Sequence, residues 1–166
     1  MAVVISDASP LVHLGSIGRF GLLKQLYPVL LIPPAVWREV TVAGQGRPGA
    51  AELAGAVQVG WIKLQTPAAM TVARAELRGL DLGEAEALAL ALDTSAEFVL
   101  LDELRGRAVA RTLGVRAIGT LGVLIEAKRQ GLVSLLSDEL EQLRRLSQLQ
   151  LTPELERLAL QLAGEN

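Results

Sequence analysis

Short apolar runs separated by helical patterns are the feature of this 166-residue chain that most restricts its fold. The runs lie at residues 2–6, 29–32, 60–64, 98–101 and 115–118. Strands that are apolar on both faces and alternate with helices are typical of a parallel sheet covered by helices on both sides. The pattern therefore predicts an α/β fold: a three-layer sandwich with a central parallel sheet of about five strands, flanked by helices.

The helical segments complete this expectation. Proline is tolerated in the first turn of a helix, so Pro33 and Pro34 predict a helix start. Leucine and alanine spacing predicts a longer helix at residues 82–94, and two more between residues 134 and 163. The length suits one domain over residues 1–166, with residues 134–166 as a helical C-terminal extension packed on it.

Composition excludes several kinds of site. The chain has no cysteine and a single histidine, His13, which excludes disulfides, thiolate chemistry and a multi-histidine zinc site within one chain. A metal would therefore bind to oxygen ligands, which favours Mg²⁺ or Mn²⁺. The net charge of −2 excludes a strongly basic coat for nucleic acid, so a polyanion must meet a local patch.

The apolar segments predict no membrane association. The N-terminus lacks the basic start and apolar run of a signal peptide. The longest apolar stretches are too short to span a bilayer. We expect a cytoplasmic protein.

Two of the predicted strands end in an aspartate, Asp7 and Asp102. Either one alone is most simply a turn or helix-cap residue. Function in parallel sheets collects at the carboxyl ends of the strands, and two carboxylates there repel each other unless a proton or a cation lies between them. The pair therefore predicts an acidic site.

The helix at residues 82–94 carries two glutamates, Glu84 and Glu86, that face nearly opposite sides. The stripe that continues from Glu84 is mostly apolar and is expected to face the sheet. The stripe of Glu86 is more polar and is expected to face solvent. Glu84 is therefore the candidate site residue, although Asp81 and Glu84 also have the spacing of a capping box. Glu39 is a fourth candidate, because it lies close to the apolar stripe of its helix.

Five segments in this order resemble the PIN-domain ribonucleases, and more closely a VapC-like toxin branch. They are DASPLVHL (7–14), PPAVWREV (33–40), LGEAEALALA (82–91), LLDELRGRAVA (100–110) and GTLGVL (119–124). The resemblance covers most of residues 1–133. It implies a parallel-sheet sandwich and an acid cluster that holds Mg²⁺ or Mn²⁺.

The resemblance assigns the acids residue by residue. The catalytic acids are Asp7, Glu39, Glu84 and Asp102, of which Asp7, Glu84 and Asp102 are expected metal ligands. Most VapC-like proteins have an aspartate in third place, where this chain has Glu84. The family spacing to the fourth acid fits Glu84 and not Glu86.

Three further residues are candidates for substrate binding or support. Ser9 matches a hydroxyl that accompanies the first acid, but it could equally form a local turn. Thr120 is either a supporting group or the N-cap of the next helix. Arg107 could hold a phosphate of RNA or lie on a solvated face. His13, in an apolar segment, is expected to be a hydrogen-bonded structural residue, and Glu103 a solvated turn residue.

The leading interpretation is a metal-dependent endoribonuclease that acts on RNA as the toxin of a pair with a proteic antitoxin. The alternative is a PIN-fold module that binds RNA or protein without turnover. An aspartate-nucleophile phosphatase would want a second aspartate where Ser9 stands, and no glycine-rich phosphate loop follows Asp7. Leucines of residues 140–162 have the spacing of a helical stripe, which is more often core but would also suit a homodimer.

Overall fold

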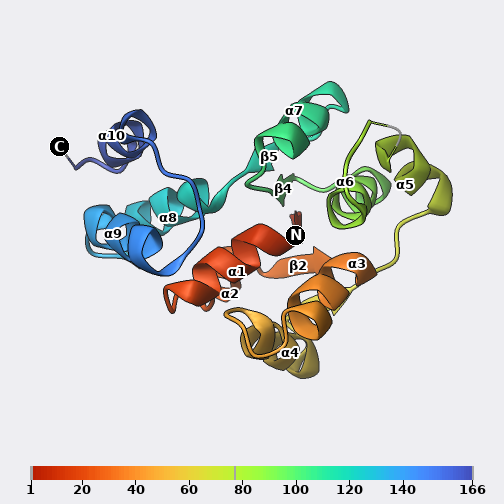
Figure 1. Cartoon of the computed structure of the whole chain (residues 1–166), viewed down its shortest axis with the longest axis horizontal. Coiled ribbons are helices and arrows are strands. Elements are labelled where there is room, and N and C mark those ends of the chain that lie inside the picture. The colour runs from red at the N-terminus through yellow and green to blue at the C-terminus, as the bar shows by residue number, and fades with distance from the viewer. Residues whose placement is uncertain (1, 77, 166) are drawn as a thin grey trace.

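The computed structural model describes residues 2–76 and 78–165 and contains one five-stranded parallel sheet (Figure 1). The strands are β1 (Val3–Ser6), β2 (Val29–Ile32), β3 (Ile62–Leu64), β4 (Phe98–Leu100) and β5 (Ala117–Ile118). Their order is β3-β2-β1-β4-β5, so the strand order reverses between β1 and β4. The predicted parallel sheet is confirmed, and β3 and β5 are each two residues shorter than the apolar runs that predicted them.

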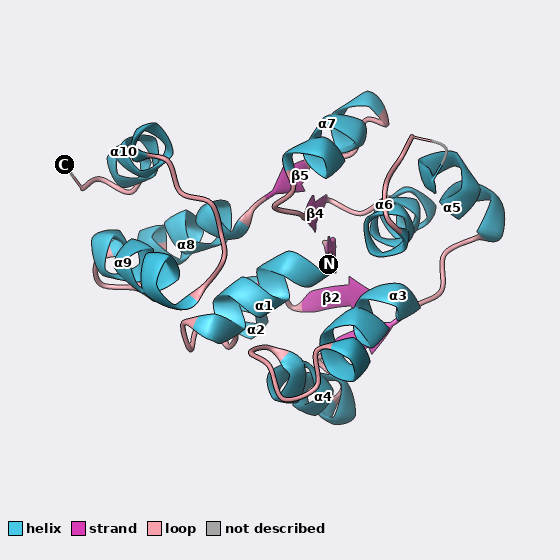
Figure 2. Ribbon diagram, viewed as in Figure 1, coloured by secondary structure: helices cyan, strands magenta, loops and turns pink. Residues whose placement is uncertain are grey.

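Helices connect all the strands (Figure 2). They are α1 (Ala8–Ser16), α2 (Leu22–Leu26), α3 (Pro34–Trp37), the π-helix η1 (Arg38–Ala43), α4 (Ala50–Val59), α5 (Ala69–Glu76), α6 (Leu82–Thr94), α7 (Leu104–Thr112), α8 (Thr120–Arg129), α9 (Leu136–Leu146) and α10 (Pro153–Leu162). Pro33 is the N-cap of α3, and α6 has the predicted bounds. The π-helix was not predicted.

The two faces of the sheet bury different side chains, because neighbouring residues of a strand point to opposite sides. Val4, Leu30 and Leu100 pack on one face with helices α1, α2, α4, α8 and α9. Ile5, Leu31 and Val99 pack on the other face with α5, α6 and α7. The chain therefore forms the three predicted layers.

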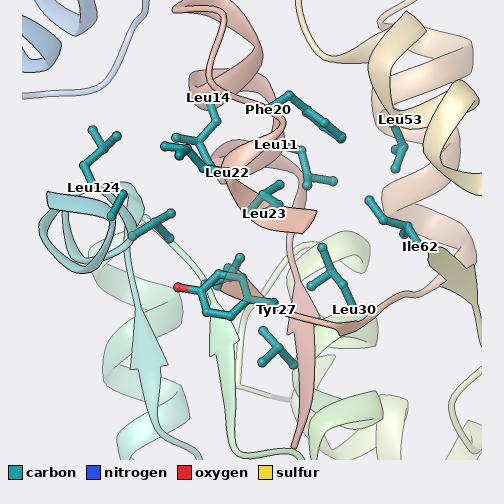
Figure 3. Close-up of a cluster of buried hydrophobic side chains, with 14 of the residues drawn as sticks. Leu11, Leu14, Phe20, Leu22, Leu23, Tyr27, Leu30, Leu53, Ile62 and Leu124 are labelled. Carbon is teal, nitrogen blue, oxygen red and sulfur yellow. The ribbon is translucent and has the colours of Figure 1, made fainter. Parts of the chain in front are cut away.

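Aliphatic side chains dominate the larger of the two cores (Figure 3). Figure 3 shows Leu11 and Leu14 of α1 above Leu30 of β2, with Leu124 of α8 on one side and Leu53 of α4 on the other. All five are at most 1% exposed. This packing fixes α1, and with it the residue that precedes α1, against the sheet.

The C-terminal helices extend the larger core. Leu136, Leu140 and Leu143 of α9 are buried in it. Figure 1 shows α8, α9 and α10 gathered at one end of the molecule, away from α5 and α6. Along α10, Leu155 and Leu158 are 41% and 52% exposed. The predicted leucine stripe is therefore buried at Leu140 and Leu143, and exposed at Leu146 of α9 and along α10.

A two-point ion pair also holds α9 in place. Arg19 donates from Nε to Oε2 of Glu139 at 3.0 Å, and from its terminal nitrogen to Oε1 at 2.5 Å. Glu139 is 5% exposed, whereas the side chain of Arg19 is 40% exposed. The pair joins the segment after α1 to a helix 120 residues further along the chain.

We expect Glu139→Ala to lower the free energy of unfolding by about 2 kcal/mol, less than for a fully buried pair because Arg19 is partly solvated. Urea unfolding followed by circular dichroism measures the change. Glu141→Ala is the matched control, since Glu141 is exposed on the same helix. Equal effects of the two substitutions would show that the ion pair does not stabilise the fold.

No helix in the described ranges is both long enough and apolar enough to span a membrane.

Candidate active site

The four predicted acids lie around the carboxyl edge of the sheet. Asp7 follows β1 directly and is the N-cap residue of α1. Asp102 lies two residues after β4. Glu39 is in η1, which follows β2 and α3, and Glu84 is in the first turn of α6. The chain thus delivers each acid from a different connection of the sheet, beside the point where the strand order reverses.

Three carboxylates converge on Gly83. A Cβ atom placed on this glycine would lie 3.3 Å from Oε2 of Glu39, 3.5 Å from Oδ1 of Asp7 and 3.6 Å from Oδ1 of Asp81. Asp81 is the N-cap of α6, and its Oδ1 accepts a hydrogen bond from the backbone N–H of Glu84 at 2.8 Å. We refer to Asp7, Glu39, Glu84 and Asp81 as the acid cluster.

Burial and mutual repulsion raise the pKa values within the acid cluster. Asp7 is 4% exposed, and burial is the largest cause that raises its pKa from 3.8 to about 8. A hydrogen bond from the backbone of Ala8 opposes this shift, while the charges of Glu39, Glu84 and Asp81 add to it. At neutral pH, the carboxyl group of Asp7 is therefore stabilised by binding either a proton or a cation.

The same causes act on the neighbours of Asp7. Burial, followed by the charges of Asp81 and Glu103, raises the pKa of Glu84 from 4.5 to about 7. Glu39 is exposed as a residue, but partial burial of its carboxyl group and the charge of Asp81 raise its pKa as well. Asp81 caps α6, as the alternative interpretation of its spacing to Glu84 proposed, so one short turn supplies both a helix cap and two members of the acid cluster.

Asp102 lies in a separate hydrogen-bond network. Its Oδ1 accepts from the backbone N–H of Thr120 at 2.6 Å, and its Oδ2 accepts from the hydroxyl of Thr120 at 2.7 Å. Nδ1 of His13 lies 2.8 Å from the same Oδ2. The side chain of Asp102 is 7% exposed. These donors fix the carboxylate at the start of α8.

The structure gives specific partners to three residues whose roles the sequence left open: His13, Thr120 and Arg107. His13 is hydrogen-bonded, as predicted, and its partner is the fourth acid. Thr120 is not the N-cap of α8, because Gly119 occupies that position, and Thr120 instead supports Asp102. Arg107 donates to the backbone carbonyl of Leu101 at 3.1 Å, so its guanidinium turns back toward the end of β4.

The expectation that Glu86 faces solvent is wrong. Glu86 is 8% exposed, and its Oε1 accepts a hydrogen bond from the backbone N–H of Ala35 at 3.1 Å. The N-terminus of α3 covers this stripe of α6, and a helix N-terminus attracts negative charge. Glu103 is exposed, as predicted, yet its charge acts on Glu84.

Two glycines are site residues that the sequence analysis missed. Gly83 leaves room for the acid cluster. A Cβ on Gly119 would lie 2.9 Å from Oδ1 of Asp102 and 3.0 Å from a guanidinium nitrogen of Arg107. Each glycine directly precedes a candidate, Glu84 or Thr120, and this adjacency was the available signal.

If the site cleaves RNA, as the resemblance to PIN-domain ribonucleases implies, Gly119→Ala should reduce cleavage by about 10–100-fold, because the new methyl group must displace Asp102 or Arg107. Cleavage rates per folded molecule measure the effect. Gly55→Ala is the control: it lies inside α4, and apart from the backbone of its own helix and its chain neighbours, its added Cβ would meet nothing within 4 Å. It should raise the free energy of unfolding by about 0.5–1 kcal/mol and leave cleavage unchanged. A Gly119→Ala protein with full activity would contradict this account of Asp102.

The donor chemistry of the site suits a hard divalent cation. Its side chains present carboxylate oxygens, which Mg²⁺ and Mn²⁺ prefer. In the described residues, no three His, Cys, Asp or Glu side chains already stand together in position to hold one ion. Metal binding would therefore require carboxylates of the acid cluster and Asp102 to move closer together around the cation, which would also relieve the repulsion at Asp7.

Two cavities differ in their relation to this site. One of about 490 Å³ is lined by Ala2, Pro28, Glu97 and Arg116, which are the residues directly before β1, β2, β4 and β5. It therefore lies at the amino edge of the sheet, opposite the acids. A groove of about 380 Å³ is lined by Ser9, His13 and Glu39 and adjoins the candidate site. The groove of about 380 Å³ is therefore the space that a substrate of the acids could occupy.

Two solved structures share this fold. VapC20 of Mycobacterium tuberculosis, described as a toxin that cleaves the sarcin-ricin loop, is 19% identical with a TM-score of 0.50 and covers 64% of this chain and 94% of its own. PAE2754 of Pyrobaculum aerophilum is 20% identical with a TM-score of 0.54 and covers 76% of this chain and 97% of its own. At this identity the likeness concerns the fold. A comparison with curated proteins gives no significant match.

A family model, DUF3368, described as a PIN domain, matches residues 3–165. This range includes all four predicted acids and both C-terminal helices. The five-stranded parallel sheet and its two helical layers are the architecture of the same family. The chain therefore belongs to the PIN-domain family, with the fold of its VapC-like members.

Proposed function

We propose that this protein is a metal-dependent endoribonuclease that hydrolyses phosphodiester bonds in RNA, and that it acts as the toxin of a pair with a proteic antitoxin. PIN domains are generally nucleases, and this chain belongs to that family. The observation that carries the proposal is the acid cluster around Gly83, in which buried Asp7 faces two further carboxylates. The toxin role draws support from the likeness of the fold to VapC20.

The proposed ligands are Asp7, Glu84 and Asp102, and the position of Glu39 beside Asp7 adds it to that set. When bound, Mg²⁺ or Mn²⁺ would supply Lewis acidity toward the phosphate and a more acidic water. Ser9 lines the adjoining groove, where its hydroxyl can donate to a phosphate oxygen of the substrate.

The residues around these carboxylates orient them and take no direct part in the reaction. Thr120 and His13 hold both oxygens of Asp102 in one orientation. Asp81 fixes the first turn of α6, and so the place of Glu84. Arg107 is proposed to support the carboxyl end of β4 through its hydrogen bond to Leu101, rather than to bind RNA directly.

The direct test is cleavage of fluorescently labelled RNA by purified protein in Mg²⁺ or Mn²⁺, and in EDTA. We expect cleavage with metal and none in EDTA. Asp7→Asn protein from the same purification serves as the control for contaminating nucleases. Metal binding without cleavage of any RNA in a diverse pool would instead favour a binding module without turnover. Equal cleavage by wild type and Asp7→Asn would contradict the proposed site.

A further inference from the structure

The groove of about 380 Å³ beside the candidate site is built from three separate segments. One wall is α1, and a second is η1 with residues 44–48. The third is the last residue of α9, Leu146, with the first two residues of the link to α10, Ser147 and Gln148. The C-terminal extension therefore forms part of a space that opens next to the acids. Its volume falls within the range of about 300–1,000 Å³ that is usual for ligand sites.

The groove shares residues with both parts of the candidate site. Glu39 belongs to the acid cluster and lines the groove. His13 holds Asp102 through Nδ1, and its ring lines the groove as well. If a phosphate of an RNA strand lay at the acids, a neighbouring nucleotide of that RNA would therefore lie beside this groove.

The groove also contains polar groups that do not belong to the acid cluster. Arg47 is exposed and forms no ion pair with any described residue. The amide of Gln148 and the hydroxyl of Ser9 are neutral hydrogen-bonding groups. One free guanidinium with neutral donors and acceptors suits a nucleotide, which offers a phosphate and the edge of a base. A guanidinium plane can also stack on a base.

Close backbone packing holds the Arg47 segment in place. A Cβ on Gly15 of α1 would lie 2.6 Å from the backbone nitrogen of Gly49, so the two backbones touch. Gly49 has φ +91°, a conformation that side chains disfavour. The N–H of Arg47 donates to the carbonyl of Gly44 at 2.9 Å. A segment fixed in this way has less conformational freedom to lose when a ligand binds.

We propose that this groove is a subsite for a single-stranded RNA nucleotide next to the scissile phosphate, with Arg47 as its phosphate contact and Gln148 as a contact to the base or ribose. The proposal rests on the proposed nuclease function. It assigns to the C-terminal extension a direct part in substrate binding.

The test measures the binding of a short single-stranded RNA in EDTA, by fluorescence anisotropy over a series of salt concentrations, so that cleavage plays no part. We expect Arg47→Glu to weaken binding at least about tenfold and to lower the salt slope by about one. Gln148→Ala should weaken binding about three- to tenfold with the slope unchanged. The matched control is Arg157→Glu, which makes the same charge change on the exposed face of α10.

The same variants are then compared in cleavage with Mg²⁺ or Mn²⁺. A higher KM at similar kcat for Arg47→Glu supports the subsite. If wild type cleaves RNA and both groove variants match Arg157→Glu in binding and KM, the subsite is overturned and the nuclease function stands. In that case the groove faces a protein partner or solvent. A different result is that wild type fails to cleave RNA, while Arg47→Glu weakens RNA binding and the control Arg157→Glu does not. The nuclease function is then contradicted, and the groove stands as an RNA-binding site.

Discussion

Asp7→Asn is expected to lose RNA cleavage and yet to unfold at a higher temperature than the wild type in metal-free solution at pH 8. The loss of activity follows because an amide is a much poorer ligand for a hard cation than a carboxylate. We expect cleavage to fall by more than about 100-fold, beyond the effect typical of a residue that only supports a ligand.

The gain in stability follows from the raised pKa of Asp7. This group has a pKa of 3.8 unfolded and about 8 folded, so the folded state binds its proton more tightly. The contribution of Asp7 to stability is therefore fully present below about pH 4 and is lost as the pH rises through about 8. Asparagine has no charge to bury, and one pKa unit corresponds to about 1.4 kcal/mol.

Thermal unfolding in EDTA at pH 5 and at pH 8 measures this effect. At pH 8 we expect Asp7→Asn to be more stable by about 2 kcal/mol or more, which corresponds to a Tm higher by about 4–8 °C. The difference should be smaller at pH 5. Added Mg²⁺ should raise the Tm of the wild type and leave that of Asp7→Asn nearly unchanged. A variant less stable than the wild type at pH 8 would show that Asp7 is not a destabilising buried charge.

Glu84→Gln and Glu86→Gln are expected to differ sharply in their response to Mg²⁺ and in RNA cleavage, although the two residues lie only two apart on α6. Glu84→Gln should lose the response of the Tm to Mg²⁺ and most of the cleavage, because its carboxylate belongs to the acid cluster. Glu86→Gln should keep both, since an amide oxygen can still accept the hydrogen bond from Ala35. Titration of each variant with Mg²⁺, followed by Tm and cleavage, separates the two.

Glu86→Ala adds the structural control for this pair. It leaves the N–H of Ala35 without its acceptor and should cost about 1–3 kcal/mol of stability. Cleavage per folded molecule should change far less than in Glu84→Gln. If Glu86→Gln abolished the metal response and Glu84→Gln did not, the two assignments would have to be exchanged.

The order of the elements was determined by the sequence, because an apolar run of four residues between helices leaves few alternatives to a buried parallel strand. The same logic predicted that acids at strand ends would meet at one edge of the sheet. It also singled out Glu84, since the apolar stripe that follows it must face the core. These inferences need only the local pattern of the sequence and general rules of sheet topology.

The tertiary structure alone decided what covers each polar group. The stripe of Glu86 looks solvated by its composition, but the N-terminus of α3 covers it, and the two lie 51 residues apart. The predicted acids divide into the acid cluster and the Asp102 network because Thr120 and His13 capture one carboxylate. Such contacts depend on distances between segments far apart in the chain. Hydrophobic periodicity constrains which face of an element is buried, but not which neighbour buries it.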